Sequence, residues 1–194
     1  MKNILVALLL LAGGAVFSLR AQIESSPADD LPNLLAQVDL TKDVNTTFYE
    51  VWQVPIFEEL ANTESRVITI LTGTMKVMKL PVETTFLHQI GTYNHRGLQK
   101  LNDRLVLAGS NAKAEALVAS AELEEHQILF LENALENTED LDVILLYDRI
   151  RSISKDNLRD IVAELQKEGI TYRPIVMSDK YFDMQVILET APVF

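Results

Sequence analysis

Residues 112–137 read AKAEALVASAELEEHQILFLENALEN, and the apolar side chains in this stretch recur every three or four positions. That spacing is typical of an amphipathic α-helix with one face in a protein core. The stretch contains neither proline nor glycine, and Ser110 or Asn111 just ahead of it can cap a helix. We therefore predict a long helix here. Its inward-facing line consists of Leu117, Ala121, Glu124, Ile128, Leu131 and Leu135.

The same period recurs along most of the chain, and no segment alternates as a half-buried strand would. From Val82 to Arg96 the pattern weakens, which indicates a long connection between the second and third long helices. Four long helices with one long connection favour a ferritin-like four-helix bundle over a simple up-and-down bundle. We thus predict an all-α fold whose crossover connection carries a short extra helix. The long helices are expected at about 31–52, 55–79, 112–137 and 140–168, and short ones at about 97–108 and 178–188.

The N-terminus has the features of a secretory signal peptide. A short cationic start with Lys2 leads into the apolar run 4–17, and small residues precede a cleavage point before Gln22. The apolar run is shorter than the roughly 18 residues expected of a membrane span. We expect residues 1–21 to be removed on export to the periplasm or the medium, leaving no stable membrane insertion. The alternative is a retained N-terminal anchor.

The rest of the chain suits one domain. The polar stretch 22–30 is predicted to be a disordered lead, and 31–190 to be the bundle. The chain has no cysteine, so thiolate metal sites and thiol nucleophiles are excluded. Its formal net charge of -11 disfavours nucleic acid as a partner and suits cations, although the acids can equally serve only solubility. An unidentified protein partner or a homodimer fits this composition.

Two carboxylates interrupt otherwise apolar helix faces. Glu64 lies one turn from Ala61 and Ile68, and Glu124 lies similarly within the line given above. Because an unpaired buried charge is costly, such positions indicate either a metal ligand or a special acid. The acid alternative is a carboxyl held protonated or hydrogen-bonded by Asn157, Gln127 or Tyr147.

The histidines and the neighbouring acids do not complete a metal site on the sequence pattern alone. His126 follows Glu124 by two positions and should face away from it. His88 and His95 fall in the long connection, where we expect surface roles; a second possibility is a site shared between two subunits, with one of them supplied by the partner. Glu122 and Glu125 lie off the apolar line and are expected to be solvated.

Several motifs together resemble a family catalogued as domain of unknown function 2202, a ferritin-like family. The similarity extends from about residue 31 to 188. It is carried by FYEVWQVPIF at 48–57, LANTES at 60–65, LQKL at 98–101, GS at 109–110, AL at 116–117, EE at 124–125, GITYRP at 169–174, Ser178, and FD at 182–183.

The resemblance implies a ferritin-like bundle with metal ligands at carboxylate and histidine positions, and this chain departs from most of them. The acidic cluster of the first helix falls on Ala36, Gln37 and Val38. The histidine of a Glu-x-x-His motif becomes Val67, the acid three residues after Glu124 becomes Gln127, and the last helix has Asn157 in place of histidine. Only Glu64 and Glu124 carry over, with Glu125 as a possible third.

From these departures we expect a member with a degenerate metal site. Two carboxylates do not supply the several anionic and imidazole ligands that a pair of irons needs. The leading interpretation is an exported, non-enzymatic binding or structural protein without a cofactor. The alternative is a remnant iron- or manganese-binding protein, or a di-iron oxidoreductase-like enzyme, that uses Glu64 and Glu124.

Overall fold

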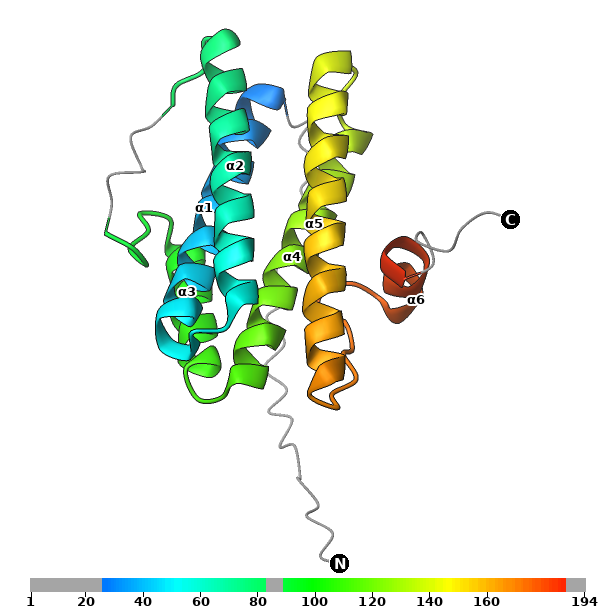
Figure 1. Ribbon diagram of the computed structural model, residues 1–194. Helices are drawn as coiled ribbons and strands as arrows, with labels where there is room; N and C mark the ends of the chain where they lie inside the picture. The colour runs from blue at the N-terminus through cyan, green and yellow to red at the C-terminus, as the bar shows by residue number, and fades with distance from the viewer. Residues whose placement is uncertain (1–25, 83–88, 188–194) are drawn as a thin grey trace, which may run out of the picture.

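The structure is a computed structural model that describes residues 26–82 and 89–187. These residues form helices and connecting turns, with no β-strand among them, so the all-α prediction is confirmed. Each long helix lies within a few residues of its predicted range. The elements, labelled as in Figure 1, are α1 Pro27–Trp52, α2 Pro55–Val77, α3 Arg96–Gly109, α4 Lys113–Glu136, α5 Leu141–Lys167, α6 Asp179–Phe182 and the π-helical turn η2 Asp183–Ile187.

The four long helices pack in two pairs. α1 lies along α2, and α4 lies along α5; the pairs then meet through α1 with α4 and, more sparsely, through α2 with α5. Figure 1 shows that α2 and α4 run in the same direction, so the connection between them has to return along the length of the molecule. α3 lies in this connection and packs against α1 and α4.

Local sequence explains why the helices begin and end where they do. The α1–α2 corner is tight because Gln53 takes a left-handed conformation with φ 53°, and its backbone N–H donates to the carbonyl of Tyr49. Pro55 then begins α2, where a missing N–H costs no hydrogen bond. Gly169, with φ 75°, follows α5 in the left-handed conformation that only glycine adopts without strain.

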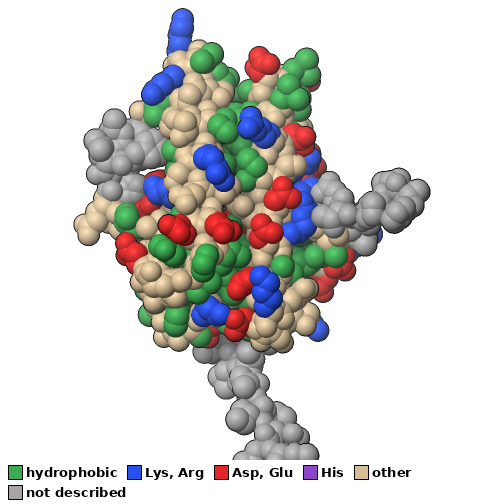
Figure 2. Space-filling view, viewed as in Figure 1, with side chains coloured by type: hydrophobic (Ala, Val, Ile, Leu, Met, Phe, Trp, Pro, Cys, Tyr) green, Lys and Arg blue, Asp and Glu red, His purple; other side chains and the backbone are tan. Residues whose placement is uncertain are grey.

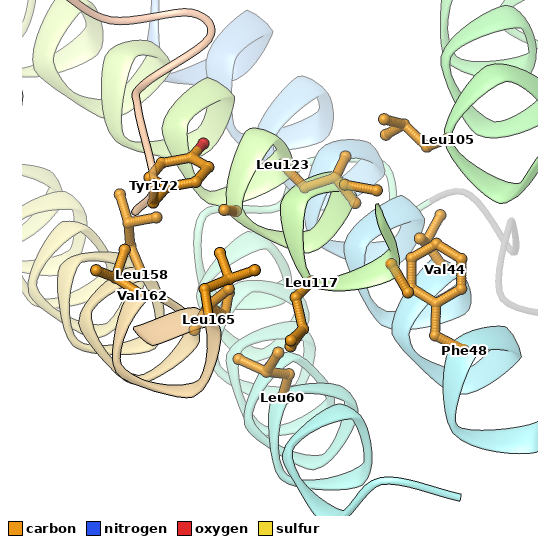
Figure 3. Packing of buried hydrophobic residues seen from close by; sticks show 14 of the residues in the cluster. Val44, Phe48, Leu60, Leu105, Leu117, Leu123, Leu158, Val162, Leu165 and Tyr172 are labelled. Carbon is orange, nitrogen blue, oxygen red and sulfur yellow. The ribbon is translucent and has the colours of Figure 1, made fainter. Parts of the chain in front are cut away.

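The core consists of two apolar clusters stacked along the molecule. The first lies toward the α1–α2 corner and includes Phe48, Phe57 and Leu117, and the second lies toward the other end and includes Val38, Val67 and Tyr147. Figure 3 shows part of the first cluster, where Leu60, Leu117 and Leu165 from three helices point toward one another. Along α2 and α5 the two clusters are separated by polar residues, and this break in the core is where the candidate site lies. The break contains Glu64, Ser154 and Asn157.

The helical region starts earlier than predicted. α1 begins at Pro27, so 27–30 belong to the helix and not to a disordered lead, and Asp30 is buried. The physical reason is a favourable start: Pro27 suits the first helical position, and Asp29 and Asp30 complement the positive end of the helix dipole. The predicted signal peptide 1–21, the remaining lead residues 22–25 and His88 lie outside the described residues. Within the described ranges, every helix is too short or too polar to span a bilayer.

Candidate functional site

Two carboxyl groups from different helices meet in the break between the core clusters. Glu64 of α2 and Glu124 of α4 are both completely buried, with 0% exposure. The side-chain amide of Asn157 on α5 donates to both: its Nδ2 lies 3.1 Å from Oε1 of Glu64 and 3.0 Å from Oε1 of Glu124. One amide therefore holds the two acids together. We call Glu64 and Glu124 the acid pair, and Asn157 its bridge.

The other oxygens around the acid pair have no donor. Oε2 of Glu64, Oε2 of Glu124 and Oε1 of Gln127 are buried, and no described residue forms a hydrogen bond to them. The amide nitrogen of Gln127 is occupied, because it donates to the hydroxyl of Ser154 at 2.7 Å. All three unpartnered atoms are acceptors if the acids are ionised, so the site is short of protons or positive charge.

Burial makes both acids resist ionisation. It raises the pKa of Glu64 to about 8, against the opposing effect of the nearby amides of Gln127 and Asn157. The pKa of Glu124 is also raised well above its ordinary value, first by burial and then by the negative charge of Glu64. No lysine, arginine or histidine of the described chain contributes to either shift. A proton is therefore the simplest positive charge that this interior can hold.

The residues around the acid pair do not fit two metal ions. The position three residues after Glu64 is Val67, which is buried with Val38 in the second core cluster and has no atom that coordinates a metal. Asn157 turns its N–H groups toward the carboxyls, and an N–H group is not a ligand. Across residues 26–82 and 89–187, three or more acid, histidine or cysteine side chains nowhere gather in a metal-binding arrangement. A di-metal centre needs more anionic and imidazole ligands than this.

A surface cleft lies directly outside the bridge. It has a volume of about 310 Å³ and lies between α2 and α5, the pair of neighbouring long helices with the sparsest contact. Asn157, only 7% exposed, lines this cleft and also donates to both buried carboxyls. The lining residues are Ile56, Glu59, Leu60, Asn62, Thr63 and Arg66 of α2 and Asn157 and Asp160 of α5.

The sequence-based candidates divide into those that meet at the site and those that lie apart. Glu64, Glu124, Gln127 and Asn157 come together as described above. Tyr147 does not join them: it lies in the second core cluster, and its buried hydroxyl has no described partner.

The two histidines within the described residues have local partners. His126 is part-exposed and its Nε2 lies 3.7 Å from Oε1 of Glu122, one turn earlier on α4. His95 is exposed and caps α3, where its Nδ1 accepts a hydrogen bond from the backbone N–H of Leu98 at 3.4 Å. A site shared between two subunits through His95 stays a prediction.

The expectation that Glu122 and Glu125 are solvated is wrong. Both are buried, with 6% and 0% exposure. Glu122 forms a two-point ion pair with Arg104 of α3. The error has a physical cause: α3 and the C-terminal segment cover further faces of α4, and the apolar line of a helix does not reveal a polar contact made on another face.

Glu125 anchors the segment that follows α5. Its carboxylate accepts hydrogen bonds from the hydroxyl of Tyr172 at 2.5 Å and from the backbone N–H groups of Ile175 at 3.0 Å, Val176 at 2.5 Å and Met177 at 2.9 Å. These donors occupy both oxygens of the buried carboxylate, so Glu125 holds the C-terminal segment against α4. The sequence did hold a signal for it, because EE at 124–125 and the Tyr172 motif both belong to the resemblance.

Comparisons with known proteins agree with this architecture. The family described as "Uncharacterized protein domain (DUF2202)" matches residues 30–190. The chain is 23% identical over 161 residues to "Uncharacterized protein MJ0754" of Methanocaldococcus jannaschii, a match that covers 83% of this chain and 86% of that protein. The crystal structure of hypothetical protein MJ0754 from Methanococcus jannaschii superposes with a TM-score of 0.78 at 24% identity, covering 90% of this chain and 98% of that one. The structural likeness shows a shared fold.

Proposed function

The chain belongs to the DUF2202 family, and on that premise we propose that it is a ferritin-like bundle whose two-metal site has become a hydrogen-bonded acid pair. The crossover between α2 and α4 supports the ferritin-like part of this proposal, because bundles of that class have one such connection. Glu64 and Glu124 then occupy two of the inward carboxylate positions.

One observation carries the proposal: Asn157 donates one amide nitrogen to both carboxyls, at 3.1 and 3.0 Å. At the corresponding place the resemblance implies a histidine. An amide that donates N–H replaces part of the stabilisation that a cation would give to two carboxyls. It thereby keeps the helices in register without a bound cation. Val67 supports the same conclusion, because a fully buried valine fills the place of another expected histidine.

We propose that the protein acts by binding or assembly and not by catalysis, in the periplasm or outside the cell. The predicted signal peptide supports export, and intact-mass measurement of the protein from its host would test cleavage before Gln22. An exported protein that still carries Met1 would contradict this part of the proposal.

Metal content tests the central claim. The protein is purified without chelator, soaked separately in ferrous iron, manganese and zinc, and measured by elemental mass spectrometry. We expect no stoichiometric metal, and no change in unfolding temperature with a chelator. The matched variant restores two implied ligands, as Val67→His with Asn157→His, and should gain metal. Stoichiometric metal in the unchanged protein, lost in Glu64→Ala, would overturn the proposal.

A second candidate function follows from the three unpartnered oxygens. Oε2 of Glu64, Oε2 of Glu124 and Oε1 of Gln127 form an all-oxygen set, which suits a single hard cation such as manganese better than a pair of irons. Under this alternative the protein is a remnant iron- or manganese-binding protein. Glu64→Ala should then abolish manganese uptake, whereas the exposed variant Glu58→Ala on the same helix should leave it intact; uptake that survives Glu64→Ala would exclude this site.

A further inference from the structure

The α2–α5 cleft has an innermost surface that differs from its rim. Both N–H groups of Asn157 are used on Glu64 and Glu124, and they point into the protein. Asn157 also lines the cleft, and its amide oxygen Oδ1 is the polar atom of this side chain that the acid pair does not use. No described residue donates to this oxygen. Asn157, which is 7% exposed, thus carries an unused acceptor within the wall of the cleft.

The charges lining the cleft are mostly negative. Glu59 and Asp160 are exposed carboxylates, one from each helix, and Arg66 is the single cationic residue among the eight lining residues. The guanidinium of Arg66 donates to the hydroxyl of Thr63 at 2.8 Å. Figure 2 shows acidic side chains across the middle of the face formed by α2 and α5, with hydrophobic side chains between them. A positively charged group is therefore favoured here over an anion.

The cleft also has an apolar wall. Ile56 and Leu60, one turn apart on α2, line it together with the polar residues. A volume of about 310 Å³ is at the lower end of the range for small-molecule sites. An apolar wall beside hydrogen-bond acceptors suits a ligand with a short hydrocarbon part and a cationic head.

We propose that the α2–α5 cleft binds a small aliphatic primary amine, with its ammonium group on Oδ1 of Asn157 and between the carboxylates of Glu59 and Asp160. A primary ammonium has three N–H donors and no acceptor, which matches three acceptors of this kind. Its hydrocarbon part lies along Ile56 and Leu60. A bare metal ion would leave the apolar wall unused, and a neutral alcohol would leave the two carboxylates uncompensated. The inference extends the proposed binding role by naming a ligand class, and it rests on that role.

The probe for this proposal is n-butylamine, titrated calorimetrically into the full protein in phosphate buffer near neutral pH. 1-Butanol and butyrate serve as the neutral and anionic probes of the same length. We expect saturable binding of the amine and at least about tenfold weaker binding of the other two. Charge variants then locate the site. Glu59→Gln and Asp160→Asn should each weaken amine binding by about two- to fivefold, the range of an exposed ion pair.

Arg66→Gln should act in the opposite direction and strengthen amine binding, because it removes the one positive charge among the lining residues. The matched control is Asp142→Asn, an exposed acid in the first turn of α5, which should leave binding unchanged. Equal binding of butylamine and butanol, affinity unchanged in both acid variants, or no saturable binding would each overturn the inference.

The amine titration and the metal measurement test different claims, so one proposal can be overturned while the other stands. Stoichiometric metal at the acid pair overturns the proposed function, whatever the amine does in the cleft. Absence of amine binding in a protein that also holds no metal overturns this inference and leaves the proposed function in place.

Discussion

Glu64 and Glu124 lie on α2 and α4, sixty positions apart in the sequence, and their carboxyls meet because each accepts a hydrogen bond from the same amide nitrogen of Asn157. The relationship joins three of the four long helices at the level where the two core clusters separate along α2 and α5. It also places two groups that resist ionisation beside each other, which has measurable consequences for stability.

Replacing Glu64 by Gln should leave the protein as stable or make it more stable. At pH 8 the free energy of unfolding should rise by about 1 kcal/mol, because the amide keeps an acceptor for Asn157 and removes the cost of a buried charge. Chemical denaturation measures this directly. Glu58→Gln, an exposed acid on the same helix, should change the free energy of unfolding by less than about 0.5 kcal/mol. A large loss in Glu64→Gln would indicate that the ionised carboxylate has a partner.

The acid pair should make the protein less stable as pH rises. The pKa of Glu64 is raised from 4.5 to about 8 by burial, so between these values the folded state binds more protons than the unfolded state. Stability from this group is complete below pH 4.5 and is lost as pH rises through about 8, with a slope of up to about 1.4 kcal/mol per pH unit for one proton. Other groups also titrate, so the quantity to measure is the difference between the unchanged protein and Glu64→Gln across this range. A difference that does not vary with pH would contradict the prediction.

Removing the carboxylate of Glu125 should release the C-terminal segment. Glu125→Ala leaves the buried N–H of Met177 and its neighbouring donors without an acceptor, at a cost of about 3 kcal/mol or more. Hydrogen exchange should accelerate over 172–187, while α1 and α2 keep their protection. Glu115→Ala, an exposed acid in the first turn of the same helix, is the control and should change neither. Uniform loss of protection along the chain would indicate that the substitution destabilises the whole protein and does not release the C-terminal segment alone.

Two glycine substitutions should act in opposite directions. A Cβ on Gly109 would lie 2.3 Å from Cζ of the buried Phe48 ring and 2.9 Å from the backbone Cα of Ala116, so Gly109→Ala should destabilise by about 1–3 kcal/mol. Gly73 is an exposed position within α2 with nothing within 4 Å of a new Cβ. Gly73→Ala should stabilise by about 1 kcal/mol, because alanine has the higher helix propensity. Thermal unfolding of both variants under one condition checks the sign of each effect.

The site shows where a single-helix pattern succeeds and where it fails. Glu64 and Glu124 stand out in the sequence because each interrupts an apolar line that repeats with the helix period, and the structure buries both completely. Glu125 does not stand out, because its partners are the hydroxyl of Tyr172 and the backbone N–H groups of 175–177, about fifty residues away. Main-chain donors leave no trace in side-chain chemistry, so only the folded chain reveals them.

The sequence by itself determined the helices, because the signals for them are local. The apolar period, the proline that begins α2 and the glycine after α5 each act on residues only a few positions away. It also determined that Glu64 and Glu124 face inward, because facing follows from the same period, but it did not reveal the burial of Glu122 and Glu125. Only the tertiary structure decided what those acids do. The Asn157 bridge, the burial of Glu122 beneath Arg104 and the α2–α5 cleft each depend on the distance and rotation between helices. The distance and rotation between helices depend on how the faces of several helices pack together, so no single segment of the sequence determines them.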